Sequence, residues 1–244
     1  MNIIVNVKVI GGDGAFSEDN SSFLISFKDI ILLFDCPVNT FNYIMKYNIN
    51  AQHVFVSHTH FDHISGLEQL FYYNYFVKNK ITKVYAGEEV LDELKKIFEK
   101  SNFVYDNGSL VAEKIVEFLS VEELNDKLKK RNVEIRTIKG NHIVKHNYGL
   151  VMIFNDLKKV LVITGDTKAS QEIADEINWL LSYDELYVFH DYSEIDNVFK
   201  NIHCCETDFN YYYKELIENN KVKWFKYHNK TFNKEFKDKT IIIK

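Results

Sequence analysis

Proline and glycine are scarce in this chain. Its 244 residues include one proline, Pro37, and nine glycines. This composition excludes Gly/Pro-rich linkers, recognition arms and low-complexity tracts. With 46% hydrophobic and 27% charged residues, a chain of this length can bury a large core. We therefore expect a single domain spanning residues 1–244.

Cysteine is also scarce, and its spacing carries no metal or disulfide pattern. The three cysteines, Cys36, Cys204 and Cys205, are odd in number, and two of them are adjacent. A disulfide framework needs paired positions, and a zinc finger needs spaced cysteine pairs. We expect reduced thiols and a cytoplasmic protein.

Long apolar runs and excess positive charge are missing as well. No stretch approaches the ~20 apolar residues that a membrane-spanning helix needs, so we expect no membrane association. The N-terminal run Met1–Val5 lacks signal-peptide features and indicates a first strand. The net charge of -5 argues against tight, sequence-independent binding along a polyanion, although it leaves room for a local basic patch.

What the chain does have is a dense cluster of metal-ligating side chains. Six consecutive positions hold four potential ligands: His58, His60, Asp62 and His63. A core strand would not carry so many polar groups without partners, and a surface loop needs no imidazoles. The cluster follows the apolar run Val54-Phe55-Val56 and precedes Gly66, which indicates a strand-to-helix loop. Such loops usually carry the chemistry of an α/β sheet.

Strand and helix patterns alternate along the whole chain. Alternating or continuous apolar runs predict strands at 3–10, 22–27, 30–34, 53–56, 83–86, 134–138, 150–154, 160–163, 186–189 and 222–225. Helical spacing predicts helices at 40–47, 67–78, 88–100, 121–130 and 211–218. The pattern fits an α/β fold, specifically an αββα sandwich of two mixed sheets flanked by helices.

Further candidate ligands follow predicted strands. His142 comes after the strand at 134–138, Asp166 after 160–163, and His228 after 222–225. His190 and Asp191 follow the strand at 186–189. Because strand ends meet at one edge of a sheet, these residues can converge with the histidine cluster.

The chain resembles the metallo-β-lactamase superfamily in the HxHxDH run at 58–63, followed in order by His142, Gly165-Asp166-Thr167 and His228. The resemblance implies that His58, His60 and His142 bind a first metal ion. It implies that Asp62, His63 and His228 bind a second, and that Asp166 bridges both. Asp62 also counts among the expected catalytic residues.

The ligand types suit two zinc ions best, with manganese or iron as alternatives. Two such ions can hold a hydroxide that attacks phosphorus near neutral pH. Some assignments have alternatives. His146 could replace His142 as the ligand, Asp166 could be a turn residue, and His53, which precedes its strand, is better explained as structural.

Within this superfamily, two features of the chain resemble one branch, the tRNA 3′-processing endonucleases and related phosphodiesterases. The first is the opening Gly11–Phe16 with Ser21–Ile25 and Phe34-Asp35-Cys36, although Pro37 stands where those proteins usually have glycine. The second is the pair Asp191 and His203. The resemblance implies that Asp191 orients His203, which donates a proton to the leaving alkoxide. A surface histidine in a loop is the alternative explanation for His203, and His190 has no assigned role.

The substrate expectation rests on this resemblance and on what is missing. The tRNA endonucleases grip tRNA with a Gly/Pro-rich arm, and this chain has no such segment. It is most similar in size and motif to the phage anti-Pycsar phosphodiesterases, which open 3′,5′-cyclic mononucleotides and so remove a defence signal. The resemblance implies a cyclic nucleotide substrate, a homodimer and, for a phage protein, the host cytoplasm. The alternatives are a tRNA 3′ endonuclease and a non-catalytic, metal-stabilised binding protein.

Overall fold

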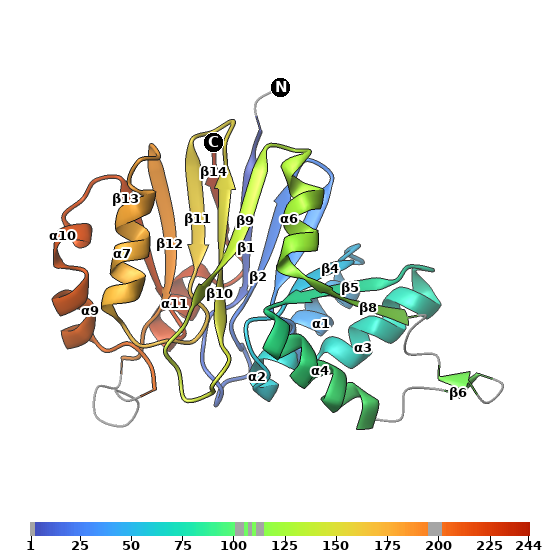
Figure 1. Ribbon diagram of the computed structural model, residues 1–244. Coiled ribbons are helices and arrows are strands. Elements are labelled where there is room, and N and C mark those ends of the chain that lie inside the picture. The colour runs from blue at the N-terminus through green and yellow to red at the C-terminus, as the bar shows by residue number, and fades with distance from the viewer. Residues whose placement is uncertain (1–2, 101–104, 107–108, 111–114, 195–201) are drawn as a thin grey trace. The chain divides into compact units, whose positions relative to one another are not determined.

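The structure, a computed structural model, describes residues 3–100, 105–106, 109–110, 115–194 and 202–244. The chain forms two compact units, one of residues 1–120 with 236–244 and one of residues 121–235. Each unit contains one main mixed sheet flanked by helices (Figure 1). This confirms the predicted α/β class with two mixed sheets, whereas the single domain over 1–244 stays a prediction.

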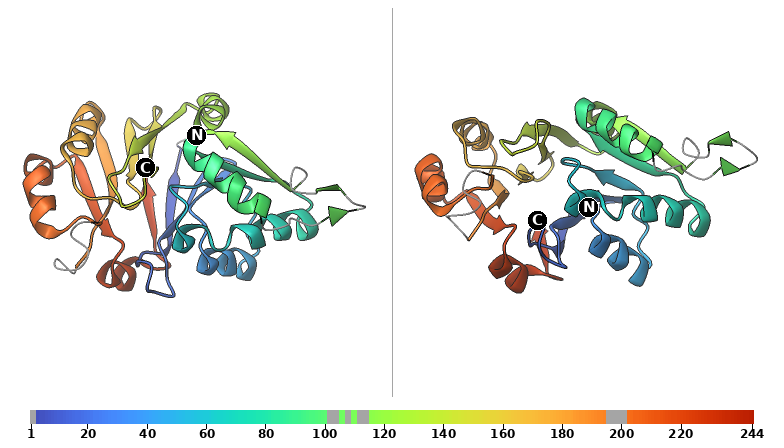
Figure 2. Two further views of the ribbon diagram at one scale, coloured as in Figure 1. Left: turned by 60° about the horizontal axis from the view of Figure 1, so that its bottom comes forward. Right: turned by 90° about the horizontal axis from the view of Figure 1, so that it is seen from below.

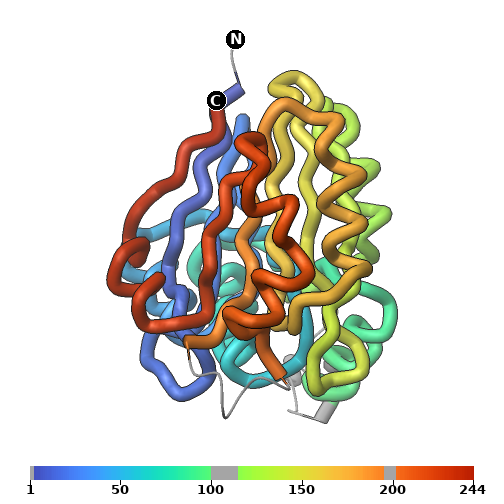
Figure 3. Tube along the Cα trace, turned by 90° about the vertical axis from the view of Figure 1, so that its left-hand side faces the viewer, coloured from blue at the N-terminus to red at the C-terminus, as the bar shows by residue number. Residues whose placement is uncertain are grey.

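The first unit is built on a seven-stranded sheet in the order β14-β1-β2-β3-β4-β5-β8. Its strands are β1 (Val5–Gly11), β2 (Ser22–Phe27), β3 (Ile30–Phe34), β4 (His53–Phe55), β5 (Thr82–Ala86), β8 (Val116–Ser120) and β14 (Thr240–Ile243). β14 pairs with β1 although the two come from opposite ends of the sequence (Figure 3). From β3 to β8 the strands run parallel, so the loops after β3 and β4 leave the same edge.

Helices and a small hairpin complete this unit: α1 (Val38–Lys46), α2 (Phe61–Ile64), α3 (Leu67–Tyr72), the π turn η1 (Tyr73–Val77), α4 (Glu88–Lys100), and strands β6 (Tyr105–Asp106) and β7 (Ser109–Leu110). α1 lies against α3, and α4 packs on β5 and β8 (Figure 2). The helix predicted over 67–78 is interrupted by the π turn. Buried Asn74 lies in that turn and donates to Ala51 O and Thr82 Oγ1, at 2.8 and 2.9 Å.

The second unit contains a five-stranded sheet in the order β13-β12-β11-β10-β9. The strands are β9 (Val133–Lys139), β10 (Tyr148–Phe154), β11 (Lys159–Ile163), β12 (Glu185–Asp191) and β13 (Val222–Tyr227). β11, β12 and β13 are parallel, so the residues that follow them leave one edge together. The helices are α6 (Val121–Lys129), α7 (Gln171–Leu180), α9 (Glu206–Tyr212), α10 (Lys214–Ile217) and α11 (Lys230–Phe236), which crosses the unit boundary.

One face of this second sheet is covered by α7, α9 and α10 (Figure 1). Apolar residues of β9–β13 and of these helices form a continuous buried core there. α7 was not predicted, although its pattern is present. Ser170 caps its N-terminus by accepting from Ile173 N, and Ile173, Ala174, Ile177 and Leu180 form its buried face.

Most predicted elements are found with shifts of a few residues at their ends, and the strands at 22–27 and 30–34 and the helix at 88–100 match fully. The helix predicted at 211–218 is instead two short helices, α9 and α10. The sequence pattern does not predict β6, β7, β8, β14, α2 or α11. Over the described ranges, no helix combines the length and apolar character needed to cross a bilayer.

Candidate metal and catalytic site

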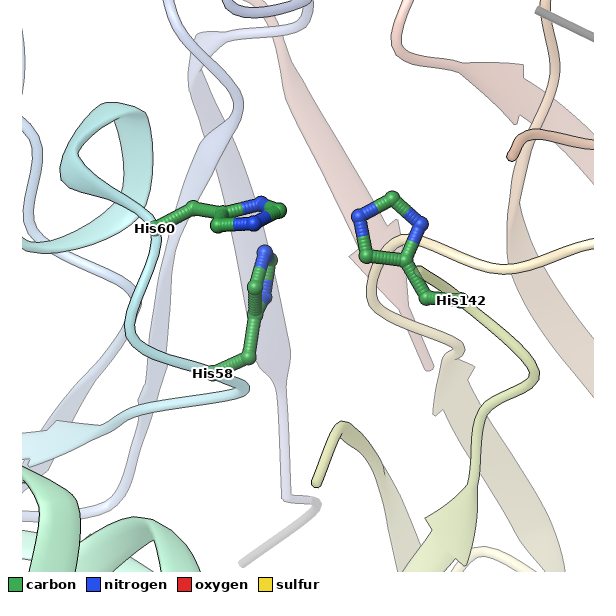
Figure 4. A group of neighbouring side chains, drawn as sticks. All are labelled: His58, His60 and His142. Carbon is green, nitrogen blue, oxygen red and sulfur yellow. The ribbon is translucent and has the colours of Figure 1, made fainter. Parts of the chain in front are cut away.

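The run His58–His63 joins β4 to α3, with its second half wound into the one-turn helix α2. The rings of His58 and His60 lie next to each other, with centroids 4.6 Å apart (Figure 4). The His63 ring is 4.2 Å from that of His58, and Asp62 Oδ2 is 3.4 Å from His63 Nε2. The first unit therefore brings all four donors predicted there into one cluster.

Asp35, which follows β3, supports two of these histidines by hydrogen bonds, His63 directly and His58 through Ser57. Its Oδ2 accepts from His63 Nδ1 at 2.7 Å and from Ser57 Oγ at 2.8 Å, and its Oδ1 accepts from Ser57 N. Since the Ser57 hydroxyl proton is donated to Asp35, Ser57 Oγ accepts from His58 Nδ1 at 3.0 Å. Both rings consequently carry their proton on Nδ1, which makes Nε2 the candidate metal-binding nitrogen.

The backbone of the turn at Asp35 has an unusual conformation and is bonded to α2. Asp35 adopts φ 58°, a left-handed conformation that is uncommon outside glycine and asparagine and clusters at functional sites. Cys36 N bonds to His63 O, and Gly66 N bonds to Cys36 O, so this turn is fastened to α2. A Cβ at Gly66 would lie 2.5 Å from Pro37 O, which requires glycine there. Pro37 directly precedes α1, where its fixed φ is compatible with a helix start.

In the second unit, His142 lies on the loop after β9 (Figure 4). Its Nδ1 donates to Ile202 O at 3.1 Å, which again makes Nε2 the candidate metal-binding nitrogen. Burial lowers the pKa of His142 and so favours the neutral ring that a metal ion binds. His142, Asp166 and His203 each offer one donor atom, and these atoms lie within 4.8 Å of one another.

The loops that carry His142 and Asp166 are bonded together. Asn147 donates its side-chain amide to Asp166 O, and Asn141 N donates to Thr167 Oγ1 at 2.8 Å. A Cβ at Gly140 would lie 2.2 Å from Asn147 Nδ2, so glycine makes room for this amide. These bonds fix the backbone beneath both candidate ligands.

Asp191 is the hub of the second unit's cluster. It is fully buried at the end of β12, and its Oδ2 accepts from His203 Nδ1 and from Thr167 N, each at 2.7 Å. Its Oδ1 lies 3.5 Å from His228 Nδ1, and His228 Nε2 lies 3.3 Å from Asp166 Oδ2. The carboxylate therefore orients His203 by a hydrogen bond, and His228 lies within ion-pair distance of both Asp191 and Asp166.

His203 and His228 differ from ordinary loop histidines. The side chain of His203 is 13% exposed, so it is not the surface histidine considered as an alternative. Its ring lies 4.5 Å from that of His228 and 5.1 Å from that of His142. His228 has φ 73°, so this predicted ligand also adopts a left-handed backbone conformation. His203, Asp191 and His228 form a further group whose donor atoms lie within 4.8 Å of one another.

The donor chemistry of both clusters fits a divalent transition metal. Imidazole and carboxylate donors are the ligands of catalytic zinc sites. A bond from Nδ1 to a carboxylate, hydroxyl or carbonyl oxygen is the usual support of a metal-binding histidine, and it is present for His58, His63 and His142. The first unit supplies His58, His60, Asp62 and His63, and the second supplies His142, Asp166 and His228.

The two remaining histidines of the prediction are placed elsewhere. His146 belongs to none of the donor groups found among the described residues, whereas His142 does. His53 Nδ1 lies 3.1 Å from Tyr85 Oη, and the two rings stack, as a structural histidine would.

Sequence reasoning missed the residues that support the donors. Asp35 was noticed only as part of Phe34-Asp35-Cys36, and Ser57, Asn147 and Thr167 were given no role. The available signals were weak: a carboxylate directly after a buried strand, and polar residues flanking the motifs. Their function depends on contacts between segments 19 to 28 positions apart in the sequence.

Solved structures with the same fold have low sequence identity to this chain. The metallo-β-lactamase fold protein YhfI from Bacillus subtilis superposes with a TM-score of 0.67 at 19% identity, covering 92% of this chain and 86% of that one. A diphosphatase of the PhnP family gives 0.69 at 14%, covering 99% and 98%. The short form of human tRNase Z gives 0.68 at 15%, covering 98% and 99%. These likenesses show the metallo-β-lactamase fold, as the sequence predicted.

No curated protein matches the chain in sequence. One family does, and its match to residues 5–242 includes both donor clusters and the elements that support them. The chain therefore belongs to the family described as anti-Pycsar protein Apyc1.

Proposed function

We propose that the protein is a dinuclear zinc phosphodiesterase that hydrolyses 3′,5′-cyclic mononucleotides. The coarser part, a metal-dependent phosphodiesterase, follows from the family and the donor set. The observation that carries the finer proposal is the pair formed by Asp191 and His203, with His203 Nδ1 2.7 Å from the carboxylate. A departing ribose alkoxide needs a proton donor, and this pair is built to supply one.

We assign the ligands as the resemblance implies. His58, His60 and His142 would hold one ion, Asp62, His63 and His228 would hold the other, and Asp166 would serve both. Bound there, two zinc ions would supply an activated water and offset charge that develops on the phosphoryl oxygens. Asp35 and Ser57 keep His58 and His63 in the correct tautomer, and Asp191 does the same for His203.

In the reaction itself, His203 protonates the leaving oxygen. Its Nδ1 proton is held by Asp191, so Nε2 is the nitrogen from which a proton can be delivered. The buried carboxylate also stabilises the protonated imidazole before transfer. The proton returns to His203 from solvent or product at the end of the cycle.

The choice of a small substrate rests on composition and family. The net charge of -5 and the single proline argue against a long polyanion gripped by a Gly/Pro-rich arm. The rival function in the same fold is tRNA 3′-end processing, and the rival outside enzymes is a metal-stabilised binding protein.

A substrate panel separates these functions. Zinc-loaded protein is incubated with 3′,5′-cyclic CMP, UMP, AMP and GMP, and with a precursor tRNA, alongside zinc-loaded His203→Ala. We expect opening of at least one cyclic nucleotide, little product from the variant, and no tRNA cleavage. Cleavage of tRNA alone would refute the proposal, and bound metal without turnover of any phosphodiester would favour the binding protein. Reloading with manganese or iron tests the choice of metal.

We further propose a cytoplasmic homodimer. All three cysteines are buried and unbonded to one another, and burial raises the pKa of the Cys36 and Cys204 thiols, which suits a reducing compartment.

Exposed apolar side chains lie on α1 and on η1, including Met45, Phe76 and Val77, and a second subunit would cover them in the proposed dimer. Light scattering tests the dimer, because a mass near the 28.8 kDa of one chain would contradict it.

A further inference from the structure

One buried histidine of the second unit lies outside the donor set. His190 is fully buried in β12, next to Asp191, and both of its ring nitrogens are bonded. Nδ1 lies 2.6 Å from the backbone oxygen of Asp191, so it donates a proton to that carbonyl. Nε2 lies 2.8 Å from Tyr213 Oη and accepts the phenolic proton. The bonds define one tautomer.

The surroundings of His190 keep this arrangement neutral and rigid. The ring meets Phe209 edge-on at 5.8 Å, Tyr213 at 5.0 Å and Trp224 at 6.3 Å. Burial lowers the pKa of His190 to about 4, so the ring is uncharged at neutral pH. Burial raises the pKa of Tyr213, which therefore stays a donor.

This chain of bonds ends on the residue that holds His203. Asp191 is the last residue of β12, and its ladder with β13 stops at Tyr227. The N–H of the peptide that follows Asp191 belongs to Tyr192 and donates to Tyr227 O at 2.9 Å, whereas the carbonyl oxygen of the same peptide is bonded by His190 Nδ1. The carboxylate of the same residue accepts from His203 Nδ1 and from Thr167 N. A rotated peptide would move the carboxylate, and with it the ring of His203.

We propose that His190 and Tyr213 are positioning residues that fix the peptide of Asp191 and thereby aim His203 at the leaving oxygen. The inference rests on the proposed function for the use made of His203. The rival explanation is that His190 merely fills the aromatic core of this unit. The two explanations differ in which substitution the site tolerates.

Two substitutions test whether His190 acts as a hydrogen-bond donor or only fills space in the core. His190→Phe keeps an aromatic ring among Phe209, Tyr213 and Trp224 but removes the donor to Asp191 O. His190→Asn fills less space but places an amide N–H near the position of Nδ1. We expect His190→Phe to lower kcat for the cyclic nucleotide by about 10–100-fold, with little change in KM or zinc content, and His190→Asn to recover part of that loss. If His190 only filled space, His190→Asn would lower kcat more than His190→Phe.

Tyr213→Phe removes the outer bond of the chain, and Tyr212→Phe is its matched control one residue away. We expect Tyr213→Phe to lower kcat less than His190→Phe, and Tyr212→Phe to leave it unchanged. Bis(p-nitrophenyl) phosphate adds a second readout, since nitrophenolate leaves without a proton donor. On this ester, His190→Phe should retain nearly full activity. An equal loss on both substrates would indicate general damage and overturn the inference.

A spectroscopic readout keeps the inference separate from the proposed function. The hydrogen-bonded Nδ1 proton of His203 is assigned in a proton NMR spectrum by its loss in His203→Ala. We expect it to shift or broaden in His190→Phe and to stay in place in Tyr212→Phe. If the wild type cleaves no phosphodiester, the proposed function fails while this measurement still tests the positioning. An unmoved resonance in His190→Phe would overturn the positioning itself.

Discussion

The substitution Asp35→Asn tests how the first unit prepares its metal ligands. The Asp35 carboxylate accepts three hydrogen bonds, two from Ser57 and one from His63, and each donor is buried. An asparagine has nearly the same shape but only one oxygen. Each of its two orientations therefore sets an N–H against a donor.

Either orientation has a predictable cost. If the amide nitrogen replaces Oδ1, the Ser57 backbone N–H loses its acceptor, which costs about 1–3 kcal/mol of folding stability. If it replaces Oδ2, it donates to His63 Nδ1 and moves that ring's proton to Nε2, the metal-binding nitrogen. Loss of such support weakens metal affinity by about 10–100-fold.

Zinc affinity by chelator competition, zinc content and thermal unfolding measure both costs. We expect zinc affinity to fall by about 10–100-fold or the Tm to fall by roughly 2–12 °C, depending on the orientation of the amide. If both orientations are populated, we expect a smaller decrease in both quantities. Asp19→Asn is the matched control, because Asp19 is a carboxylate of the same unit that pairs with Lys237 away from this cluster. Zinc affinity and Tm both equal to those of the wild type would refute the account of Asp35.

Three further predictions concern the second unit. His203→Ala should retain both metals yet lose about 10²–10⁴-fold in turnover, and loss of zinc would make His203 structural instead. Asp166→Ala should empty at least one metal site, which metal analysis detects; full zinc content would remove Asp166 from the ligand set. His190 is neutral when folded, with its pKa lowered to about 4 by burial, so the unfolded chain binds its proton first as pH falls below about 6.5. Folding stability should drop by about 2 kcal/mol between pH 7 and 5, and urea titrations should show this drop disappear in His190→Phe.

The sequence by itself determined the chemistry of the site. The run from His58 to His63 needs no tertiary information, because so many donors in six positions have no role in a core or on a surface. His142, Asp166 and His228 were found because each follows a predictable strand, and parallel strands deliver such residues to one edge. Local periodicity was likewise sufficient for most strands and helices.

The tertiary structure alone decided which residues support the donors and how. Asp35 reaches His63 across 28 positions, and Asp191 reaches Thr167 across 24, so no local pattern reveals either bond. The left-handed backbone of Asp35 and His228 is likewise imposed by surrounding contacts. No role for His190 can be assigned from the sequence, because its ring is bonded on both sides only in the folded unit. Its partners are the carbonyl of Asp191 and the phenol of Tyr213, and Tyr213 reaches it only when the segment after α9 packs on β12. Ligand identity is local chemistry, whereas ligand orientation depends on hydrogen bonds between distant segments.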